Sequence, residues 1–141
     1  MITAVRRTLV MQLETETTGR FPVLAHLSYQ ADDPFALTIA FSHDGHVLAR
    51  WRLDRQMVAD GIERPVGAGD VRIRPRVTGV WRELRLEFLG RPHSDGGRQR
   101  AVVLAWAPAV LSFLDETHRI VAPGREEVSL DGFLAEVLAR G

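Results

Sequence analysis

The chain has 141 residues and a mass of 15.8 kDa, which suit one domain with its own hydrophobic core. Its 45% of hydrophobic residues exclude a disordered chain, and its lack of Cys excludes disulfides, thiolate metal sites and thiol nucleophiles. The formal net charge of zero excludes a global positive field for nucleic acid. We therefore expect one soluble, cytoplasmic domain over residues 1–141, without a transmembrane segment.

Four strands are predicted first, because apolar side chains alternate with polar ones. Their inward positions are Val5, Leu9, Met11 and Leu13, then Val23, Ala25, Leu27 and Tyr29, then Leu37, Ile39 and Phe41, and last Val47, Ala49, Trp51 and Leu53. The third and fourth strands are joined through His43, Asp44 and Gly45. Matching their apolar faces favours a three-residue loop that pairs Phe41 with Val47 and places Gly45 where a positive φ is needed.

A short helix is predicted next, from the N-cap Asp54 to the stop at Gly61, with Met57 and Val58 facing inward. A turn region at 65–69 follows, because it combines Pro with two Gly residues.

A hairpin then runs from 71 to 89. A two-residue turn at Thr78 and Gly79 would pair Val77 with Val80 and match the apolar faces of the two strands. A Gly-rich loop at 90–97, which we expect to be mobile, precedes a seventh strand at 101–105.

Helices are predicted in the last part of the chain. Pro108 suits the first turn of one helix, whose apolar residues are Val110, Leu111, Phe113 and Leu114. A terminal helix begins near Ser129 or Asp131 and carries apolar residues at helical spacing. The fold class is therefore α+β, with antiparallel strands and two or three helices.

No catalytic residue, cofactor site or metal site is predicted. The sequence Gly67-Ala68-Gly69 is followed by a strand rather than by a helix, so it does not fit a dinucleotide-binding loop. His43 and His46 have a ligand-like spacing, but no third ligand is suggested. No Ser lies in a Gly-x-Ser-x-Gly context, and the adjacent Asp32 and Asp33 fit a solvated turn. We expect a protein that is not an enzyme.

One polar face combines basic and aromatic side chains, and it belongs to the hairpin at 71–89. Its members are Arg72, Arg74, Arg76, Trp81 and Arg85, together with the acidic Asp70, Glu83 and Glu87. The predicted register places Arg74 opposite Glu83 and lets Arg76 stack on Trp81. The face is either a solvated surface that neutralises its own charge or a binding surface, of the kind that single-stranded nucleic acids use.

Residues spread over nearly the whole chain carry a resemblance to a known family. They are Tyr29, Asp33-Pro34-Phe35-Ala36, Phe41, Trp51, Arg55, Gly61, Pro65, Gly67, Gly69-Asp70-Val71-Arg72, Pro75, Phe113-Leu114, Val121, Pro123-Gly124, Glu126 and a tail from Asp131 to Leu138. In this pattern the chain resembles the SsgA-like proteins of actinobacterial sporulation and cell division, and specifically their SsgB-like members. Two features depart from the pattern: the loop at 90–100 is longer, and Trp106 stands in place of a Pro.

The resemblance implies a fold similar to the Whirly and guide-RNA-binding proteins, with two antiparallel sheets and helices, assembled as a homotrimer. It also implies a non-enzymatic adaptor at division septa, whose partner is the tubulin-like division GTPase FtsZ or another SsgA-like protein. The alternative is a single-stranded nucleic-acid-binding protein of Whirly-like fold, although the neutral charge argues against tight nucleic-acid binding. The partner-binding residues that we expect are Arg74, Arg76 and Trp81 on the hairpin, and Glu136 and Arg140 on the terminal helix.

Overall fold

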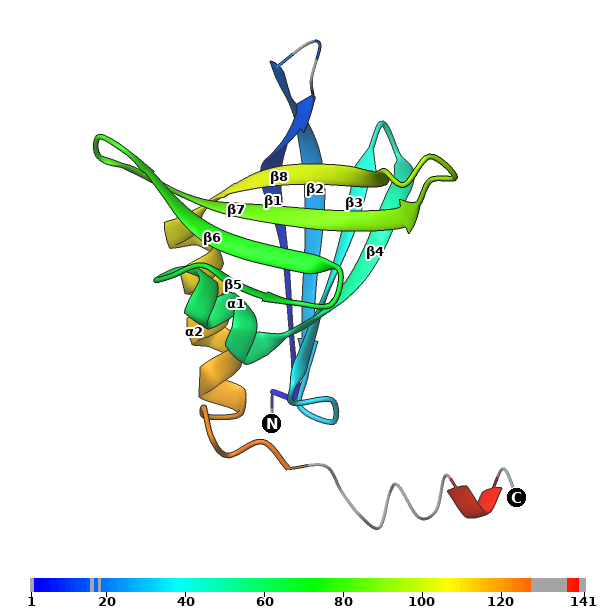
Figure 1. Ribbon diagram of the computed structural model, residues 1–141. Coiled ribbons are helices and arrows are strands. Elements are labelled where there is room, and N and C mark those ends of the chain that lie inside the picture. Colours follow the sequence, from blue (N-terminus) through cyan, green and yellow to red (C-terminus); the bar gives the residue numbers. More distant parts are fainter. Residues whose placement is uncertain (1, 16, 18, 128–136, 140–141) are drawn as a thin grey trace.

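The computed structural model describes residues 2–15, 17, 19–127 and 137–139. The described residues form one long antiparallel sheet and two helices (Figure 1). In chain order the elements are β1 (Ala4–Thr15), β2 (Gly19–Gln30), β3 (Ala36–His43), β4 (His46–Asp54), α1 (Arg55–Gly61), β5 (Val66–Ala68), β6 (Val71–Thr78), β7 (Trp81–Pro92), β8 (Arg98–Trp106) and α2 (Ala107–Ile120). In this part of the chain, neither helix is long and apolar enough to cross a membrane.

The sheet is continuous and strongly bent. Its strand order is β4-β3-β2-β1-β8-β7-β6-β5, and neighbouring strands are antiparallel. Strands β1 and β8 pair only between Gln12–Glu14 and Val102–Leu104, and β1–β4 run across β5–β8 (Figure 1). The α+β class is confirmed, whereas the expectation of two separate sheets is wrong, because this short pairing joins the halves. The likeness to the Whirly fold stays a prediction.

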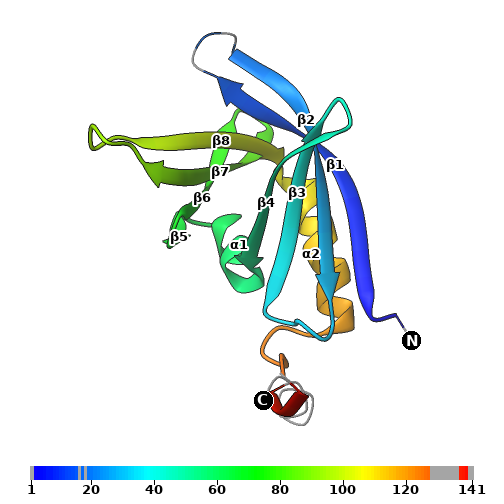
Figure 2. The same ribbon diagram turned by 90° about the vertical axis from the view of Figure 1, so that its right-hand side faces the viewer.

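The core lies in the hollow of the bent sheet, where α2 packs against β1, β7 and β8 (Figure 2). Alternation in β2 and β3 predicted the buried side chains correctly, and Val110, Phe113 and Leu114 of α2 complete this core as expected. Val47 is the exception among the predicted inward positions of β4, because it is 54% exposed.

The β3–β4 hairpin differs from its predicted register. Its turn has two residues, Asp44 and Gly45, with φ angles of 49° and 79°. A bulge between Phe41 and Ser42 then shifts the pairing, so that Phe41 lies opposite Ala49 rather than Val47. The bulge reconciles the two-residue turn with matched apolar faces, which is why a three-residue loop is not needed. The positive φ expected at Gly45 is confirmed.

The β6–β7 hairpin is also displaced, by two residues. Its turn is Gly79-Val80, so that Thr78 lies opposite Trp81 and Val77 opposite Arg82. A turn with Gly at its first central position needs a positive φ there alone, and Gly79 has a φ of 60°. The predicted turn would have required a positive φ at Thr78, which is β-branched and disfavours it. A shift of two residues leaves every side chain on its predicted face.

Three further segments complete the comparison with the predicted elements. Strand β5 was not predicted, because two Gly residues and Pro65 suggested only a turn. Strands β7 and β8 extend into the predicted Gly-rich loop, leaving 93–97 as the connection. The predicted start of the terminal helix lies outside the described residues, and 137–139 are helical.

Helix α1 begins and ends as predicted. Asp54 is the N-cap, and its side chain accepts a hydrogen bond of 3.0 Å from the amide of Met57. Gly61 is needed for space, because a Cβ there would lie 2.4 Å from Cγ2 of Ile73. Ile73 is fully buried, so it cannot move aside without disturbing β6.

Gly61→Ala should therefore destabilise the protein, although Ala favours a helix more than Gly does. Overpacking of this kind costs about 1–3 kcal/mol in free energy of unfolding. Urea unfolding measures the change. Gly97→Ala is the matched control, because its Cβ would meet only the side chains of Asp95 and His93. Equal stability of the two variants would contradict the close approach of α1 and β6.

Candidate functional site

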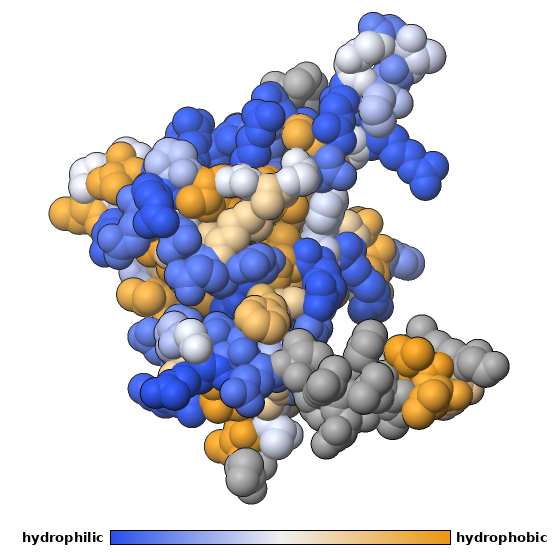
Figure 3. Space-filling view, turned by 60° about the horizontal axis from the view of Figure 1, so that its bottom comes forward, coloured by the Kyte–Doolittle hydropathy of each residue, from blue (hydrophilic) through white to orange (hydrophobic). Residues whose placement is uncertain are grey.

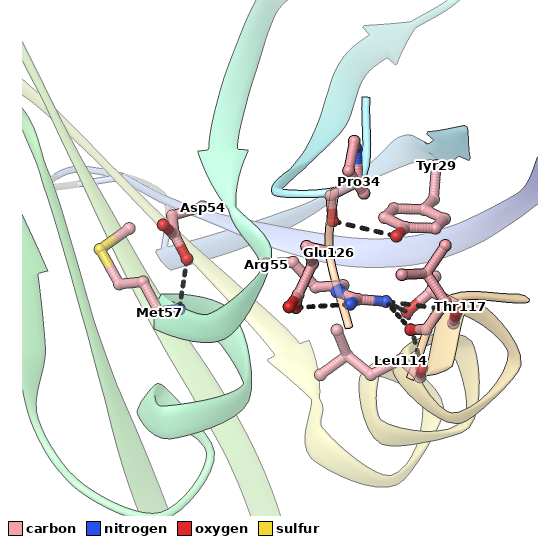
Figure 4. A network of polar contacts seen from close by, with 9 residues as sticks. Tyr29, Pro34, Asp54, Arg55, Met57, Leu114, Thr117 and Glu126 are labelled. Carbon is pink, nitrogen blue, oxygen red and sulfur yellow. Dashed lines mark hydrogen bonds and ion pairs between the residues drawn. The ribbon is translucent and has the colours of Figure 1, made fainter. Parts of the chain in front are cut away.

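A buried polar network surrounds Arg55, which is only 1% exposed to solvent (Figure 4). Its guanidinium donates hydrogen bonds to the carbonyl oxygens of Thr117 (3.2 Å) and Val121 (2.8 Å), and a second nitrogen donates to Glu126 (2.7 Å). The guanidinium also lies 4.8 Å from the ring centre of Tyr29. We call these five residues the Arg55 network.

The Arg55 network joins parts of the chain that are distant in sequence. Arg55 begins α1, and its amide donates to the carbonyl oxygen of Phe35 in the β2–β3 connection. Carbonyl oxygens at the C-terminal end of a helix lack partners within the helix, and Arg55 supplies donors to this end of α2. Glu126 belongs to the segment after α2. The network therefore fixes α1, α2 and the following segment to the sheet.

Some of the residues that carry the family resemblance lie in or beside this network. Tyr29, Arg55, Val121 and Glu126 all belong to it, and the Tyr29 hydroxyl donates to the carbonyl oxygen of Pro34 (2.9 Å). Burial raises the pKa of the Tyr29 hydroxyl, so that the hydroxyl stays a proton donor. These residues therefore have a structural role, and the surface that meets a partner has to be sought elsewhere.

The network predicts a loss of stability in acid. The hydrogen bond from Arg55 holds the pKa of Glu126 below its ordinary value of 4.5. As the pH falls below 4.5, the unfolded state binds more protons than the folded state, and stability falls. Urea unfolding at a series of pH values measures this effect. Below pH 4.5, the free energy of unfolding of Glu126→Gln should fall less steeply than that of the wild type.

His118 provides the control for this pH series. Burial is the main cause that lowers its pKa from 6.5, and the charge of Arg55 adds to it. Its effect on stability therefore begins as the pH falls through 6.5. His118→Gln should reduce the loss of stability as the pH falls from 6.5, which is above the range where Glu126 acts. Parallel curves for wild type and Glu126→Gln would contradict the role of Glu126.

The predicted partner-binding residues on the hairpin are exposed on the outer face, but their predicted pairs are wrong. Arg74 lies opposite Arg85 rather than Glu83, and the ion partner of Arg76 is Glu14 of β1, at 3.7 Å. Arg85 binds Glu87 at 2.9 Å, and this hydrogen bond lowers the pKa of the Glu87 carboxyl. The displaced hairpin register explains both errors. Since Arg76 and Arg85 have acidic partners, the nucleic-acid alternative gains no support. Glu136 and Arg140 lie outside the described residues.

An exposed notch lies beside these arginines, where β1 crosses the other half of the sheet. Three of its hydrophobic side chains are largely exposed: Trp81 at 64%, Trp106 at 55% and Val10 at 62%. We call this feature the tryptophan notch; it has a volume of about 520 Å³, and it is lined by Val10, Gln12, Arg20, Arg76, Thr78, Trp81, Glu83, Leu104 and Trp106.

The rim of the tryptophan notch is polar, and each of its arginines is paired with an acidic side chain. Arg20 binds Glu83 at 3.1 Å, and Arg76 binds Glu14. An apolar centre with a polar rim is the usual anatomy of a protein interface, and Trp and Arg are the residues most enriched in its hot spots.

The β6–β7 turn, which follows Thr78 and precedes Trp81 of the notch, also carries exposed hydrophobic residues. Val77 is 66% and Val80 is 92% exposed. This turn is the left end of the molecule in the space-filling view, where hydrophobic side chains gather (Figure 3). Val77 lies on the face of the hairpin opposite to Trp81, so this turn presents apolar side chains on both faces. Exposed apolar surface is typical of a place where another protein binds.

Sequence reasoning identified Trp81 and missed Val10 and Trp106. The signal for Val10 was present, because it stands on the polar side of the alternation in β1. Trp106 directly precedes α2, and in the sequence it was noted only because it stands in place of a Pro of the family pattern. The pairing of β7 with β8 brings Trp106 to Trp81, and the crossing of β1 and β8 brings Val10 to the same place.

The described residues contain no group of three His, Asp or Glu side chains that could hold a metal ion. His43 and His46 face each other across the β3–β4 turn, and His43 packs edge-on against Phe21.

Comparison with known proteins gives consistent results. Residues 23–126 match the family model described as "Streptomyces sporulation and cell division protein, SsgA". The chain is 34% identical over 135 residues to the sporulation-specific cell division protein SsgB of Saccharopolyspora erythraea, covering 94% of this chain and 91% of that protein. It is 31% identical over 149 residues to SsgB of Streptomyces coelicolor, covering 99% and 98%.

A solved structure shares the whole fold. The SsgA-like sporulation-specific cell division protein of Thermobifida fusca superposes with a TM-score of 0.81 at 29% identity, covering 99% of this chain and 96% of that one. The bent sheet with α2 in its hollow is therefore an architecture that this chain shares with a protein of cell division.

Proposed function

We propose that this chain, which belongs to the SsgA-like family of sporulation and cell-division proteins, is a non-enzymatic adaptor for septation. It helps to place or recruit the division machinery at septation sites, and it acts in the cytoplasm at division septa. Its partner is the filament-forming GTPase FtsZ or another SsgA-like protein. The names of its relatives support a role in cell division during sporulation.

The tryptophan notch is the observation that carries this proposal. The Arg55 network gives the buried signature residues a structural task, whereas Trp81 and Trp106 are exposed and do nothing for the core. Trp81, Arg76 and Arg74 would then act as contacts, with Arg74 steering a negatively charged partner because the described residues offer it no acidic partner.

Weak contacts suffice if the adaptor is multivalent. A trimer would present three copies of the notch to a polymer of repeating subunits. The second and third contacts then form at high effective concentration, so that avidity exceeds the affinity of a single site.

Co-sedimentation with purified FtsZ filaments tests the proposal. The wild-type protein should be retained, alone or with a purified SsgA-like relative as a bridge. Arg74→Glu should weaken retention at low salt, because charge reversal slows association. Arg82→Glu is the matched control, since Arg82 is exposed and lies opposite Val77, on the other face of the β6–β7 hairpin from Arg74. If the wild-type protein were absent from the pellet both with and without the SsgA-like relative, the adaptor function would be refuted.

We also expect a homo-oligomer, and specifically a trimer. Strands β4 and β5 end the sheet, so each leaves an edge that another chain can cover. On β4, Val47 and Leu48 are both more than half exposed. Light scattering coupled to gel filtration should give three times the chain mass of 15.8 kDa. A single species of the chain mass at micromolar concentration would contradict this expectation.

A further inference from the structure

A second surface, on the other half of the sheet, has a different chemistry from the tryptophan notch. It is an open groove of about 620 Å³ on the outer face of β1–β4. Four arginines line it: Arg6, Arg50 and Arg52 stand around a polar floor of His26, Ser28 and Thr38, and Arg7 is paired with Glu116 of α2. We call it the arginine groove. No Asp or Glu is among the described residues that line it.

The strand registers set the spacing of the charges. Arg52 lies opposite Thr38, Thr38 opposite Ser28, and Ser28 opposite Arg6, so this row crosses four strands. Neighbouring strands are about 4.8 Å apart, which places the strands of Arg6 and Arg52 about 14 Å apart. In the neighbouring row, Arg50 of β4 lies opposite Ala40 of β3, whose short side chain leaves the floor of the groove open.

Two of the four arginine charges are free to meet a ligand. Arg52 binds both carboxylate oxygens of Asp33, at 2.7 and 3.3 Å, so its charge is compensated. Arg6 and Arg50 have no ion pair with any described residue, and both are exposed. The floor is already ordered, because His26 is hydrogen-bonded to Thr8 (3.0 Å) and to Ser42 (2.9 Å).

Protection of an open sheet edge explains only part of this arrangement. Charged side chains on an edge strand prevent pairing with other chains, and this accounts for Arg50 and Arg52 on β4. Arg6 is on β1, whose pairing with β8 is confined to Gln12–Glu14, so β1 has an open edge at Arg6 as well. Edge protection does not explain why the face between the two edges is lined by arginines without any Asp or Glu among the described residues, and the groove therefore calls for another reason.

We propose that the arginine groove binds an extended acidic segment of a partner protein. An extended peptide rises about 3.3 Å per residue, so carboxylates four residues apart match the 14 Å between β1 and β4. Nucleic acid is the weaker fit, because its binding uses exposed aromatic side chains for stacking and many free cations. The groove offers two free arginines, and the exposed tryptophans are at the notch. The chain would then have two chemically distinct binding surfaces, as an adaptor requires.

The test uses a fluorescent ten-residue peptide with Glu at every fourth position and Gly and Ser between, measured by anisotropy with the full-length protein. Binding should weaken as salt rises, because the contacts are exposed charges. The double variant Arg6→Gln and Arg50→Gln should bind about ten-fold more weakly. The double variant Arg82→Gln and Arg91→Gln removes the same charge elsewhere and should bind like wild type. Circular dichroism checks the fold of both.

Each other result overturns the proposal. Equal loss in the two double variants would mean attraction by charge alone, and no binding by wild type would exclude the groove as a peptide site. Tighter binding of a labelled single-stranded oligonucleotide, with the same dependence on Arg6 and Arg50, would assign the groove to nucleic acid instead. Trp81→Ala should leave peptide binding unchanged, so failure here and failure of filament binding are distinguishable.

Discussion

Arg55→Met should destabilise the protein by about 3–5 kcal/mol, the usual effect of removing one partner from a buried ion pair. The variant leaves the carbonyl oxygen of Val121 without its side-chain donor, removes one of the two donors to the carbonyl oxygen of Thr117, and leaves Glu126 without its cation. Met fills part of the space of the Arg stem, so lost hydrogen bonds rather than a cavity dominate the cost. Urea unfolding followed by circular dichroism measures the change.

Arg52→Met is the matched control, because it breaks an ion pair of the same length in a different setting. The distances between nitrogen and oxygen are 2.7 Å in both pairs. The side chain of Arg52 is 65% exposed, whereas that of Arg55 is 2% exposed. An exposed pair contributes about 0–1 kcal/mol. If the two variants lost equal stability, burial would not be the reason for the strength of the Arg55 network.

Trp81→Ala combined with Trp106→Ala should abolish measurable retention by the division filament while the protein stays folded. A hot-spot tryptophan contributes about 2 kcal/mol or more to binding, which is a factor of about 30 for each residue. Both side chains are more than half exposed, so their loss should change the free energy of unfolding by about 0.5 kcal/mol at most. Titrated co-sedimentation measures the affinity.

Leu111→Ala is the control for this pair, because Leu111 is an exposed apolar residue on α2, outside the notch. It should bind as the wild type does. Undiminished binding by the double tryptophan variant would move the contact to another surface, and the arginine groove would be the first to examine.

The sequence predicted those parts of the fold that depend on the local order of apolar, polar and helix-capping residues. Alternation assigned the inward faces of β2 and β3, and Asp54 and Pro108 marked the beginnings of the two helices correctly. The pairing register was harder to predict, because a shift of two residues between β6 and β7 leaves every side chain on the same face of the sheet. Turn chemistry could have corrected it, since Gly79 fits the first central position of a two-residue turn better than the second.

The candidate site depended on contacts that no local pattern contains. Arg55 and Glu126 are 71 residues apart in the chain, and only the position of α2 brings them together. Trp81 was found because it stands on a polar strand face, whereas Trp106 becomes its neighbour through the pairing of β7 with β8, and Val10 through the crossing of β1 and β8. Residues of the family pattern turned out to form the core network rather than the exposed notch.

Site-specific photocrosslinking in the native host tests the central claim most directly, because it reports what touches the notch. Trp81→p-benzoylphenylalanine places the crosslinker in the notch, and Leu111→p-benzoylphenylalanine places it on the exposed side of α2. We predict adducts with FtsZ or an SsgA-like relative from position 81 and none from position 111. Adducts of equal yield from both positions, or none with any division protein from position 81, would contradict the assignment of the tryptophan notch as the partner-binding surface.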